Sequence, residues 1–555
     1  MSDEAGRGKG KINLLTNPAL PSRLAPIFNP GGNQSLNITD ILLEQVLERG
    51  HGGDAAILCG DDRITYEMLS ERVNRVGNVL IGQGIKTGER VLMIVRDTPA
   101  FFYSYLGLIK TGAVPVALNL RLTEGDLAYV INDSQCRFLL IDHEFLENYG
   151  GLSDAVKQMP GLIMTDEPPA GANTGNPLLS DLMEAASPSL TAANMEPGDP
   201  AFWVYSSGTT GQPKGVVHCH GMIEGADNYF GQMIGVKRHE RVFCTSKLFF
   251  AYTLGHALIC TLALGATAIL YPDWPDAQAI AEVIEKHKPT VVLSVPTFYR
   301  NLLRDGSAQR QALKDVRCYI SAGEKLSVSL FDEWKEATGR VISEGIGASE
   351  TIYLFIASHP DDSRAGFTGR PTPGTEVKMM DLNGDPVTEA GVPGILWVKL
   401  IGNAKGYWQL EEKTREIFVD GWYCTKDMFI RDEGDFYEYQ GRGDDMLKIS
   451  GQWVSPTEIE EVALAVPDVL QAAVVGVTDR DGLVRLAMFM VADNMADGTN
   501  ELEKRVRESL TGQLAVYKCP RRIYFIDEMP LTGSGKLQRF QLRGAAQEKE
   551  GVEAG

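Results

Sequence analysis

The chain has 555 residues, which is too long for a single hydrophobic core, so two or more domains are expected. Its composition, 44% hydrophobic and 23% charged, is that of a soluble globular protein. With 53 Lys and Arg against 73 Asp and Glu, the net charge is −20, which argues against nucleic acid or an anionic membrane as the main partner. An anionic ligand would have to be attracted by local lysines, arginines and loop dipoles.

The eight cysteines are scattered without a Cys-x-x-Cys pair, which indicates reduced thiols in a cytoplasmic protein. The residues from Met1 to Lys11 are polar and charged, so no signal peptide is expected. The most apolar window, residues 254–270, contains His256 and Gly265 and is too short to span a membrane. A buried helix followed by a strand is the prediction there.

The first half of the chain alternates between short apolar runs and amphipathic stretches. Residues 1–35, rich in Gly, Pro and Asn, predict an irregular arm, and a helix is expected to begin near Thr39 as its N-cap. The alternation that follows predicts a parallel sheet with helices on its faces. Predicted strands are 90–95, 114–117, 138–141 and 201–205, and predicted helices are 66–81, 100–110 and 124–132.

The same rhythm resumes beyond residue 240, with strands at 242–245, 268–271, 291–295, 318–321 and 341–343 and helices at 277–286 and 328–338. From about residue 366, short Gly-punctuated runs such as 377–380 and 395–399 predict a small antiparallel or barrel-like subdomain. Beyond 444 an α+β pattern follows, with helices from Pro456 and at 501–514 and strands at 472–477, 486–491 and 522–526.

These patterns predict an α/β fold. Residues 36–443 are expected to form a large N-terminal domain of βα-layered subdomains plus the small barrel-like subdomain. Residues 444–555 are expected to form a smaller α+β C-terminal domain, whose mobility is implied only by the family resemblance described below.

One stretch, YSSGTTGQPKG at 205–215, combines four hydroxyl side chains, three glycines and a lysine directly after an apolar run. Such a loop brings backbone N–H groups and hydroxyl donors close to an anion, and the carboxyl end of a strand is where open α/β sheets bind ligands. The Walker A spacing does not fit it. Taken alone, the stretch predicts either a polyphosphate-binding loop or a flexible surface turn.

Five further clusters follow in a fixed order, and each alone is weak. They are SAGE at 321–324, EGIGASET at 344–351, GWYCTKD at 421–427, GRGDDMLKISG at 441–451 and PLTGSGKLQR at 530–539. The six clusters together, at these separations, are highly specific.

On these motifs the chain, from about residue 36 to 544, resembles the adenylate-forming superfamily of acyl-CoA synthetases, nonribosomal adenylation domains and luciferases. The segments DDMLKISGQWVSPTEIE (444–460) and LFFAYTLG (248–255) are most similar to benzoate and other aryl-carboxylate CoA ligases. The resemblance implies an AMP-forming ligase. A carboxylate attacks the α-phosphorus of ATP and releases pyrophosphate, and the thiol of coenzyme A then displaces AMP from the acyl-adenylate.

The resemblance also implies roles for residues around ATP. Glu350 would hold Mg²⁺ between phosphate oxygens, Asp427 would accept the ribose hydroxyls, and Arg442 would contact the ribose nearby. The β- and γ-phosphates would be wrapped by Ser206, Ser207, Gly208, Thr209, Thr210, Gly211 and Lys214. The adenine and its surroundings would be contacted by Ala322, Gly323, Glu324, Gly345, Ile346 and Ser349.

Four residues near the C-terminus receive roles from the same resemblance. Lys536 would bridge the carboxylate and the α-phosphate during adenylation, a task that suits a flexible ammonium group. Asp444 would be the hinge about which the C-terminal domain rotates between the two half-reactions. In the second half-reaction Gly451 would leave space for the pantetheine arm and Lys448 would assist thioester formation. A solvated strand lysine is the alternative for Lys448.

The acyl pocket is expected at Phe249, Phe250, Ala251 and Tyr252, since an aromatic wall suits a flat ring. Ala322, Ile346 and Gly347 would form its floor. Benzoate ligases carry a histidine three residues after the metal-binding glutamate, whereas this chain has Tyr353. A hydroxylated or amino-substituted benzoate, an alicyclic acid and a short polar acid therefore all stay open as substrates.

Other functions compete with a stand-alone acid–CoA ligase. One is an adenylation enzyme that loads a carrier protein, another a non-catalytic nucleotide-binding protein, and a third, less supported, a luciferase-like oxygenase. The expected ligands are a small carboxylic acid, ATP, Mg²⁺ and coenzyme A, with no nucleic acid and no membrane span. A homodimer is the general expectation for such an enzyme.

Overall fold

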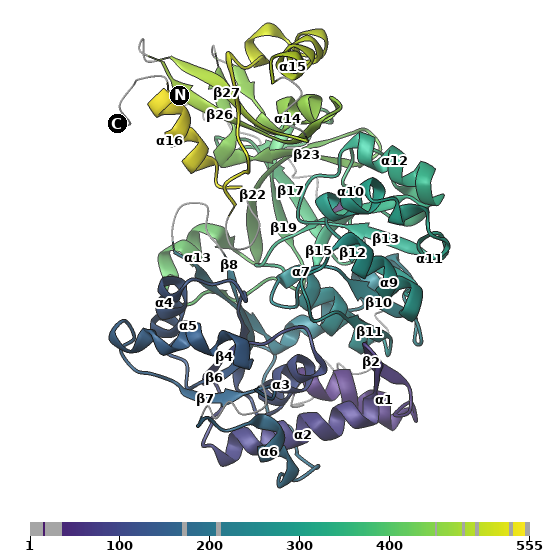
Figure 1. Cartoon of the computed structure of the whole chain (residues 1–555), viewed down its shortest axis with the longest axis vertical. Coiled ribbons are helices and arrows are strands. Elements are labelled where there is room, and N and C mark those ends of the chain that lie inside the picture. Colours follow the sequence, from purple (N-terminus) through teal and green to yellow (C-terminus); the bar gives the residue numbers. More distant parts are fainter. Residues whose placement is uncertain are drawn as a thin grey trace, which may run out of the picture.

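The fold is built on several β-sheets, as a computed structural model of the protein shows (Figure 1). The structure describes residues 15–16, 36–168, 175–206, 212–449, 452–479, 483–493, 499–531 and 537–549. Within these ranges two large sheets, one antiparallel sheet and a smaller C-terminal module can be followed. The α/β class predicted from the sequence is confirmed.

The first large sheet is parallel at its centre, and antiparallel strands close one edge. Strands β4, β5 and β6 are apolar and buried along their whole length or nearly so, as expected for parallel strands covered on both faces. Its order is β20 (Gly406–Tyr407), β9 (Lys214–Cys219), β8 (Pro200–Ser206), β5 (Val114–Ala117), β4 (Arg90–Ile94), β6 (Phe138–Ile141) and β7 (Gly161–Met164). Strands β9 and β20 run antiparallel and were not predicted.

The second large sheet repeats this plan. Strands β2, β11, β10, β12, β13 and β14 are parallel neighbours, and antiparallel strands flank them. Its order is β16 (Arg370–Pro371), β15 (Leu354–Ala357), β14 (Ile342–Gly347), β13 (Cys318–Ser321), β12 (Val291–Ser294), β10 (Arg241–Cys244), β11 (Thr267–Leu270), β2 (Ala55–Cys59) and β3 (Asp62–Thr65).

Helices cover these sheets, and Figure 1 shows α9 to α12 beside β12 and β13. Helix α2 (Tyr66–Gly82) is N-capped by Thr65, whose hydroxyl accepts from the Met68 N–H at 3.2 Å. It packs on α3 (Pro99–Lys110), where a side chain at Gly107 would meet Val76 at 2.9 Å. The other helices of this part include α1 (Gln45–Glu48), α4 (Glu124–Ser134), α5 (Leu146–Gly150), α6 (Leu179–Glu184), α9 (Ala277–His287), α10 (Pro296–Arg304), α11 (Gln311–Asp315) and α12 (Val328–Thr338).

The apolar window at 254–270 is a buried helical segment followed by a strand, as predicted. Helix α7 (Ala251–Thr253) continues through a π-helical stretch, Leu254–Cys260, into α8 (Thr261–Ala263), and β11 follows. In the ranges that the structure describes, no helix has the length and apolarity needed to cross a membrane. All eight cysteines are free thiols.

The N-terminal segment corrects two expectations. Residues Leu15–Thr16 form β1 and pair with β17 (Glu376–Met380), so part of the predicted irregular arm is a short strand. A helix does start around Thr39, but the Thr39 side chain does not cap it. Its hydroxyl donates instead to the Leu106 carbonyl of α3 at 3.2 Å, because Thr39 is fully buried against that helix.

The antiparallel subdomain expected beyond residue 366 is present. Its strands include β17, β18 (Pro386–Val387), β19 (Pro393–Lys399), β21 (Phe418–Val419), β22 (Trp422–Arg431) and β23 (Tyr437–Arg442), and α13 (Glu411–Ile417) lies beside them. Alternate residues of β19 are buried, as in a sheet with one covered face.

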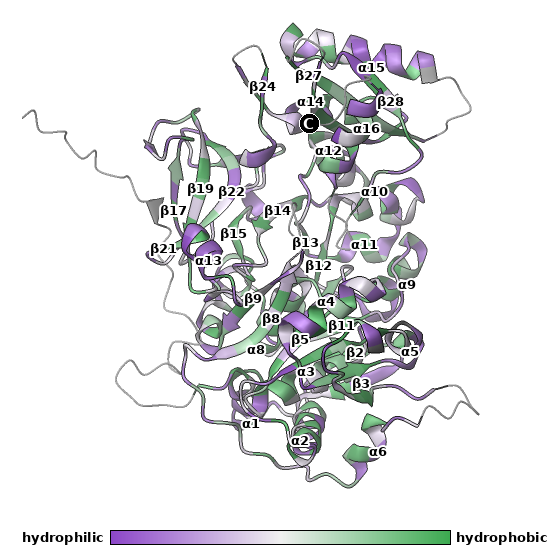
Figure 2. Ribbon diagram, turned by 90° about the vertical axis from the view of Figure 1, so that its left-hand side faces the viewer, coloured by the Kyte–Doolittle hydropathy of each residue, from purple (hydrophilic) through white to green (hydrophobic). Residues whose placement is uncertain are grey.

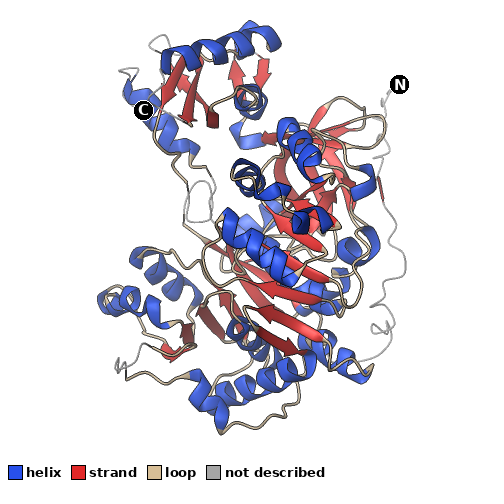
Figure 3. Ribbon diagram, turned by 45° about the vertical axis from the view of Figure 1, so that its right-hand side comes forward, coloured by secondary structure: helices blue, strands red, loops and turns tan. Residues whose placement is uncertain are grey.

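The C-terminal module lies at one end of the molecule (Figure 3). It contains β24 (Leu447–Ile449), β25 (Gln452–Val454), α14 (Pro456–Leu464), β26 (Val469–Thr478), β27 (Val484–Ala492), α15 (Thr499–Gln513), β28 (Arg522–Phe525) and α16 (Arg539–Lys549). Figure 2 shows α15 as largely hydrophilic and the central strands of the large sheets as largely hydrophobic.

Polar contacts hold this module against the rest of the chain. The Lys325 ammonium lies 2.7 Å from the Glu461 carboxylate of α14, and the Ser455 hydroxyl donates to the Gln440 carbonyl. The connection is a 3₁₀ turn, Gly443–Asp445, in which Asp444 is exposed. The predicted domain boundary at 443/444 falls in this turn and stays a prediction.

Glu344 on β14 is buried beside the Lys325–Glu461 pair, and burial raises the pKa of its carboxyl to about 7, although Lys325 opposes the rise. Between pH 4.5 and 7 the Glu344 carboxyl therefore keeps its proton in the folded chain and releases it in the unfolded chain. The free energy of unfolding consequently decreases as pH rises through this range. We expect Glu344→Gln to gain stability relative to the unaltered protein on going from pH 5 to pH 8, by up to about 3 kcal/mol. Chemical denaturation of both proteins at the two pH values measures this difference in the free energy of unfolding. An equal difference at the two pH values would contradict this account.

Candidate active site

The predicted phosphate loop joins β8 to β9. Strand β8 ends at Ser206, β9 begins at Lys214, and these two residues are cross-strand partners. Ser206 and Lys214 are both half-buried. The predicted loop residues Ser207, Gly208, Thr209, Thr210 and Gly211 lie outside the described residues. The hairpin places Ser206 and Lys214 together at the carboxyl end of β8.

Lysines gather around the base of this loop. Burial, and then the nearby charge of Lys413 on α13, lower the pKa of the Lys214 ammonium to about 8, with Lys426 of β22 acting in the same direction. The Glu350 carboxylate opposes this decrease in the pKa of Lys214. The Glu416 carboxylate pairs with Lys426 at 3.0 Å, and the nearby lysines lower its pKa. Cations that repel one another in a partly buried site are stabilised by a polyanion that binds among them. Sequence reasoning missed Lys413 and gave no role to Lys426, although Lys426 lies in the GWYCTKD motif.

Glu350 is fixed in the segment that follows β14. The Tyr407 hydroxyl of β20 donates to its carboxylate at 2.8 Å, and the Ala404 N–H donates to its carbonyl at 2.8 Å. The neighbouring Ser349 carbonyl accepts a hydrogen bond from His218 Nε2, also at 2.8 Å. Burial lowers the pKa of His218 to about 4, so this imidazole is neutral and donates through Nε2–H. Three contacts therefore hold this segment against β9 and β20.

The surroundings of Glu350 fit a magnesium ion that is shared with phosphate. The described residues contain no cluster of three or more His, Cys, Asp or Glu side chains that could enclose a metal. Magnesium bound to nucleotides takes one or two protein carboxylates and completes its shell with phosphate oxygens and water. A single anchored carboxylate beside the predicted phosphate loop is suited to that role, which stays a proposal.

The predicted ribose contacts come together on neighbouring strands. Asp427 of β22 and Arg442 of β23 are cross-strand partners, and Arg442 Nη1 lies 3.4 Å from Asp427 Oδ1. Arg442 also donates to the Thr425 carbonyl at 3.2 Å. Asp427 is largely buried, so a diol that replaced water there would meet a carboxylate already oriented by a guanidinium.

The residues expected around adenine lie at the adjacent ends of β13 and β14, where Ser321 and Glu344 are register partners. Ala322 is buried, and Gly323 adopts φ +90°, which favours glycine. The Glu324 carboxylate accepts from the Thr297 N–H at 3.1 Å and from its hydroxyl at 2.7 Å. Gly345, Ile346 and Gly347 belong to β14, and the pairing register shifts between Ile346 and Gly347.

The aromatic segment expected to line the acyl pocket follows β10. The rings of Phe249 and Phe250 lie 4.3 Å apart, and Ala251 and Tyr252 begin α7. The Leu248 N–H just before them donates to the buried Asp97 carboxylate at 3.2 Å. Asp97 follows β4, so this contact joins the first large sheet to the second at the acyl segment.

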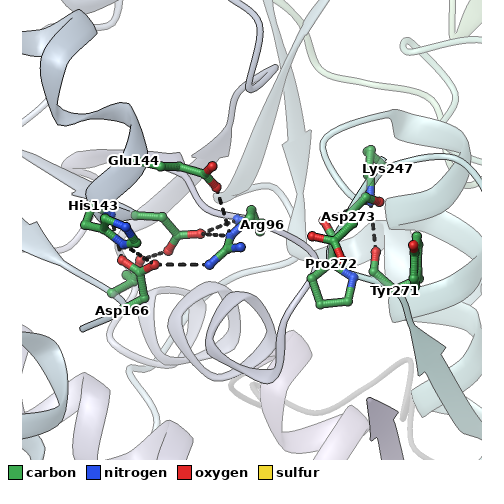
Figure 4. A network of polar contacts seen from close by, with 10 residues as sticks. Arg96, His143, Glu144, Asp166, Lys247, Tyr271, Pro272 and Asp273 are labelled. Carbon is green, nitrogen blue, oxygen red and sulfur yellow. Dashed lines mark hydrogen bonds and ion pairs between the residues drawn. The ribbon is translucent and has the colours of Figure 1, made fainter. Parts of the chain in front are cut away.

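Lys247, just before this segment, anchors it to the residues that follow β11 (Figure 4). Its buried ammonium donates to the carbonyls of Tyr271, Pro272 and Asp273 at 2.8, 3.1 and 2.5 Å, and lies 4.0 Å from Asp97. In the same view Arg96 contacts Glu144 and Asp166, which ties the ends of β4, β6 and β7 together. Sequence reasoning missed Asp97 and Lys247, which lie outside its motifs.

Tyr353, the departure noted in the sequence, is buried and its hydroxyl is engaged within the protein. The hydroxyl donates to the Met222 carbonyl at 3.3 Å. Ile352 before it has φ +57°, and a side chain at Gly255 would meet the Ile352 carbonyl at 2.6 Å. The turn after Glu350 therefore packs directly on the helix that follows the acyl segment.

The C-terminal residues with predicted roles are only partly described. Lys448 is exposed on β24, and Asp444 is exposed in the connecting turn. Lys536 and Gly451 lie outside the described residues. Arg539, three residues after Lys536, lies 2.9 Å from Glu460 and 3.6 Å from Asp445, so the segment after Lys536 is anchored beside the connecting turn. The roles of Lys448, Asp444, Gly451 and Lys536 stay predictions.

Comparison with known proteins identifies the family to which the chain belongs. Residues 43–408 match the AMP-binding enzyme family and residues 458–536 match the AMP-binding enzyme C-terminal domain. The chain belongs to the AMP-binding, adenylate-forming enzymes, as its motifs predicted.

Several of the similar proteins are CoA ligases named for aromatic acids. A 3-hydroxybenzoate–CoA/4-hydroxybenzoate–CoA ligase of Thauera aromatica is 42% identical over 93% of this chain and 98% of its own length. A benzoate–CoA ligase of the same organism is 36% identical over 92% and 96%. The crystal structure of a benzoate CoA ligase from Burkholderia xenovorans LB400 superposes with a TM-score of 0.81 at 34% identity over 91% of this chain and 99% of that one.

Proposed function

We propose that the chain converts a ring-hydroxylated benzoate, ATP and coenzyme A into an aryl-CoA thioester, AMP and pyrophosphate. It is an aromatic acid–CoA ligase of the AMP-forming type. The observation that carries the proposal is the gathering of Lys214, Lys413 and Lys426 beside Glu350 at the base of the β8–β9 loop. These lysines would supply the local positive charge that a polyphosphate needs in a chain whose net charge is −20.

The first half-reaction joins two anions, so alignment and charge neutralisation account for most of its catalysis. An acid oxygen forms a bond to the α-phosphorus while the bond from that phosphorus to the bridging oxygen of pyrophosphate breaks. Lys214 and its neighbours would stabilise the charge on the departing pyrophosphate, and Asp427 with Arg442 would hold the ribose. Magnesium at Glu350, when bound, would neutralise phosphate oxygens.

In the second half-reaction the CoA sulfur attacks the acyl carbon, the carbon–oxygen bond to AMP breaks, and the thiol proton is released. Lys536 would serve the first step and the face that carries Lys448 and Gly451 the second, with Asp444 as the hinge. The aromatic segment Phe249–Tyr252 would pack against the ring of the acid and so direct its carboxylate toward the α-phosphorus. Its support by Asp97 and Lys247 from two sheets would keep this wall in place.

The test is turnover of an acid panel with ATP and free CoA, followed by AMP release and thioester formation. We expect 3- or 4-hydroxybenzoate to give the highest kcat/KM, benzoate and aminobenzoates to follow, and palmitate to be a poor substrate. Preference for a long-chain acid would overturn the proposal. Adenylate formation without thioester on free CoA would favour a carrier protein as the acceptor instead.

A further inference from the structure

An imidazole with one unpartnered nitrogen lies behind the acyl segment. His256 is fully buried one helical turn after Tyr252, and its Nδ1 lies 2.8 Å from the Tyr252 carbonyl. A carbonyl oxygen only accepts, so Nδ1 carries the hydrogen and Nε2 of the neutral ring presents a lone pair. Burial lowers the pKa of His256 to about 4, which keeps the ring neutral at physiological pH. Among the described residues, Nε2 has no hydrogen-bond partner.

A second unpartnered polar group lies beside this imidazole. Tyr229, in the π-helical stretch Asn228–Met233, is 2% exposed, and its ring lies 5.8 Å from that of His256 in an edge arrangement. Its hydroxyl has no partner within the described part of the chain. An acceptor and a donor, each buried and without a partner among the described residues, therefore belong to two rings that pack against each other. Each costs free energy until something pairs with it.

The tyrosines that share these surroundings are already occupied. The Tyr353 hydroxyl donates to the Met222 carbonyl, and the Tyr252 hydroxyl donates to the Ile320 carbonyl at 3.4 Å. The rings of both tyrosines nevertheless pack around His256, at 6.3 and 5.4 Å. Of these four aromatic side chains, His256 and Tyr229 thus keep a hydrogen-bonding atom that no described residue pairs. The His256 ring itself packs against Tyr252 of the acyl segment and Tyr353 of the turn after Glu350.

We propose that His256 and Tyr229 bind the ring hydroxyl of the aromatic acid. His256 Nε2 accepts a hydrogen bond from this hydroxyl, and the Tyr229 hydroxyl donates one to its oxygen. The inference rests on the proposed function and deepens it by naming the groups that select the substrate. A phenol matches the pair because it donates and accepts through one oxygen. An aromatic amine donates but accepts poorly, and unsubstituted benzoate leaves both protein groups unpaired.

The test compares kcat/KM for each hydroxybenzoate isomer with that for benzoate, in the unaltered protein and in His256→Leu and Tyr229→Phe. The ratio for the isomer that the unaltered protein prefers should fall about 10- to 100-fold in either variant, since a site built to pair a hydroxyl loses that discrimination when its partner is removed. His256→Gln, which returns an acceptor, should recover part of the ratio. In the double variant the two losses should be less than multiplicative, because both residues pair with one oxygen.

Tyr105→Phe is the matched control. The Tyr105 hydroxyl is also buried and unpartnered among the described residues, but it lies on α3, where its ring stacks on Phe101. Removing it should leave the substrate ratio unchanged. Equal ratios in all variants, or an equal fall with Tyr105→Phe, would overturn the inference. An unaltered protein that forms no AMP with any aromatic acid would instead overturn the proposed function.

Discussion

Replacing Lys536 with alanine is expected to lower acyl-adenylate formation about 10²- to 10³-fold while the fold stays intact. By resemblance to the adenylate-forming enzymes, its ammonium bridges the attacking carboxylate and the α-phosphate, and loss of one preorganised donor to developing charge typically costs that much. The proposed mechanism does not use this group in the second half-reaction. Transfer of the acyl group from synthetic acyl-AMP to CoA should therefore persist at a near-normal rate.

Two assays separate the half-reactions of this variant. Pyrophosphate exchange into ATP in the presence of the acid reports the first, and thioester formation from acyl-AMP and CoA reports the second. Lys504→Ala on α15, an exposed lysine of the same module, serves as the control and should match the unaltered protein in both. Near-normal exchange in Lys536→Ala would remove this lysine from the mechanism.

Glu350→Gln is expected to lower adenylation by about 10²- to 10³-fold and to raise the magnesium concentration needed for half-maximal rate. The amide keeps the size of the side chain and can still accept from the Tyr407 hydroxyl, so the local structure should survive. What is lost is the negative charge that would hold a cation against phosphate. The effect should therefore fall on the chemistry and on metal dependence rather than on stability.

The control is Glu376→Gln. Glu376 pairs with Lys399 at 3.2 Å on the antiparallel sheet, so the same charge is removed away from the loop. Its rate and magnesium dependence should match those of the unaltered protein. A Glu350→Gln variant with normal magnesium dependence would contradict the assignment of the metal to this carboxylate.

The elements that could be predicted from the sequence are those whose signal is local. Residues Phe138–Ile141 form a continuous apolar run and a strand buried along its length, so the run predicts β6 directly. Strand β9 carries little such signal, since Lys, Gly, His and Cys surround its two valines. It exists because β8 and β20 pair with it. Thr39 had the right residue type for a cap, but burial against α3 gave its hydroxyl another partner.

The same distinction holds for the site. Ser206, Glu350, Asp427 and Arg442 lie in short motifs, so the pattern of residues along the chain is enough to name them. Tyr407 reaches Glu350 only because β20 pairs with β9, and Lys413 joins the lysines only because α13 packs nearby. No spacing in the sequence encodes those approaches. The tautomer of His256 likewise depends on a single contact with the Tyr252 carbonyl.

The most direct test follows oxygen from the acid. With the carboxylate of 3- or 4-hydroxybenzoate labelled with ¹⁸O, attack on the α-phosphorus places an acid oxygen between the acyl carbon and that phosphorus, and the thiol then releases it with AMP. Mass spectrometry of the nucleotide product should show AMP that carries one labelled oxygen in its phosphate. Unlabelled AMP, or ADP with labelled inorganic phosphate, would contradict adenylation at this site.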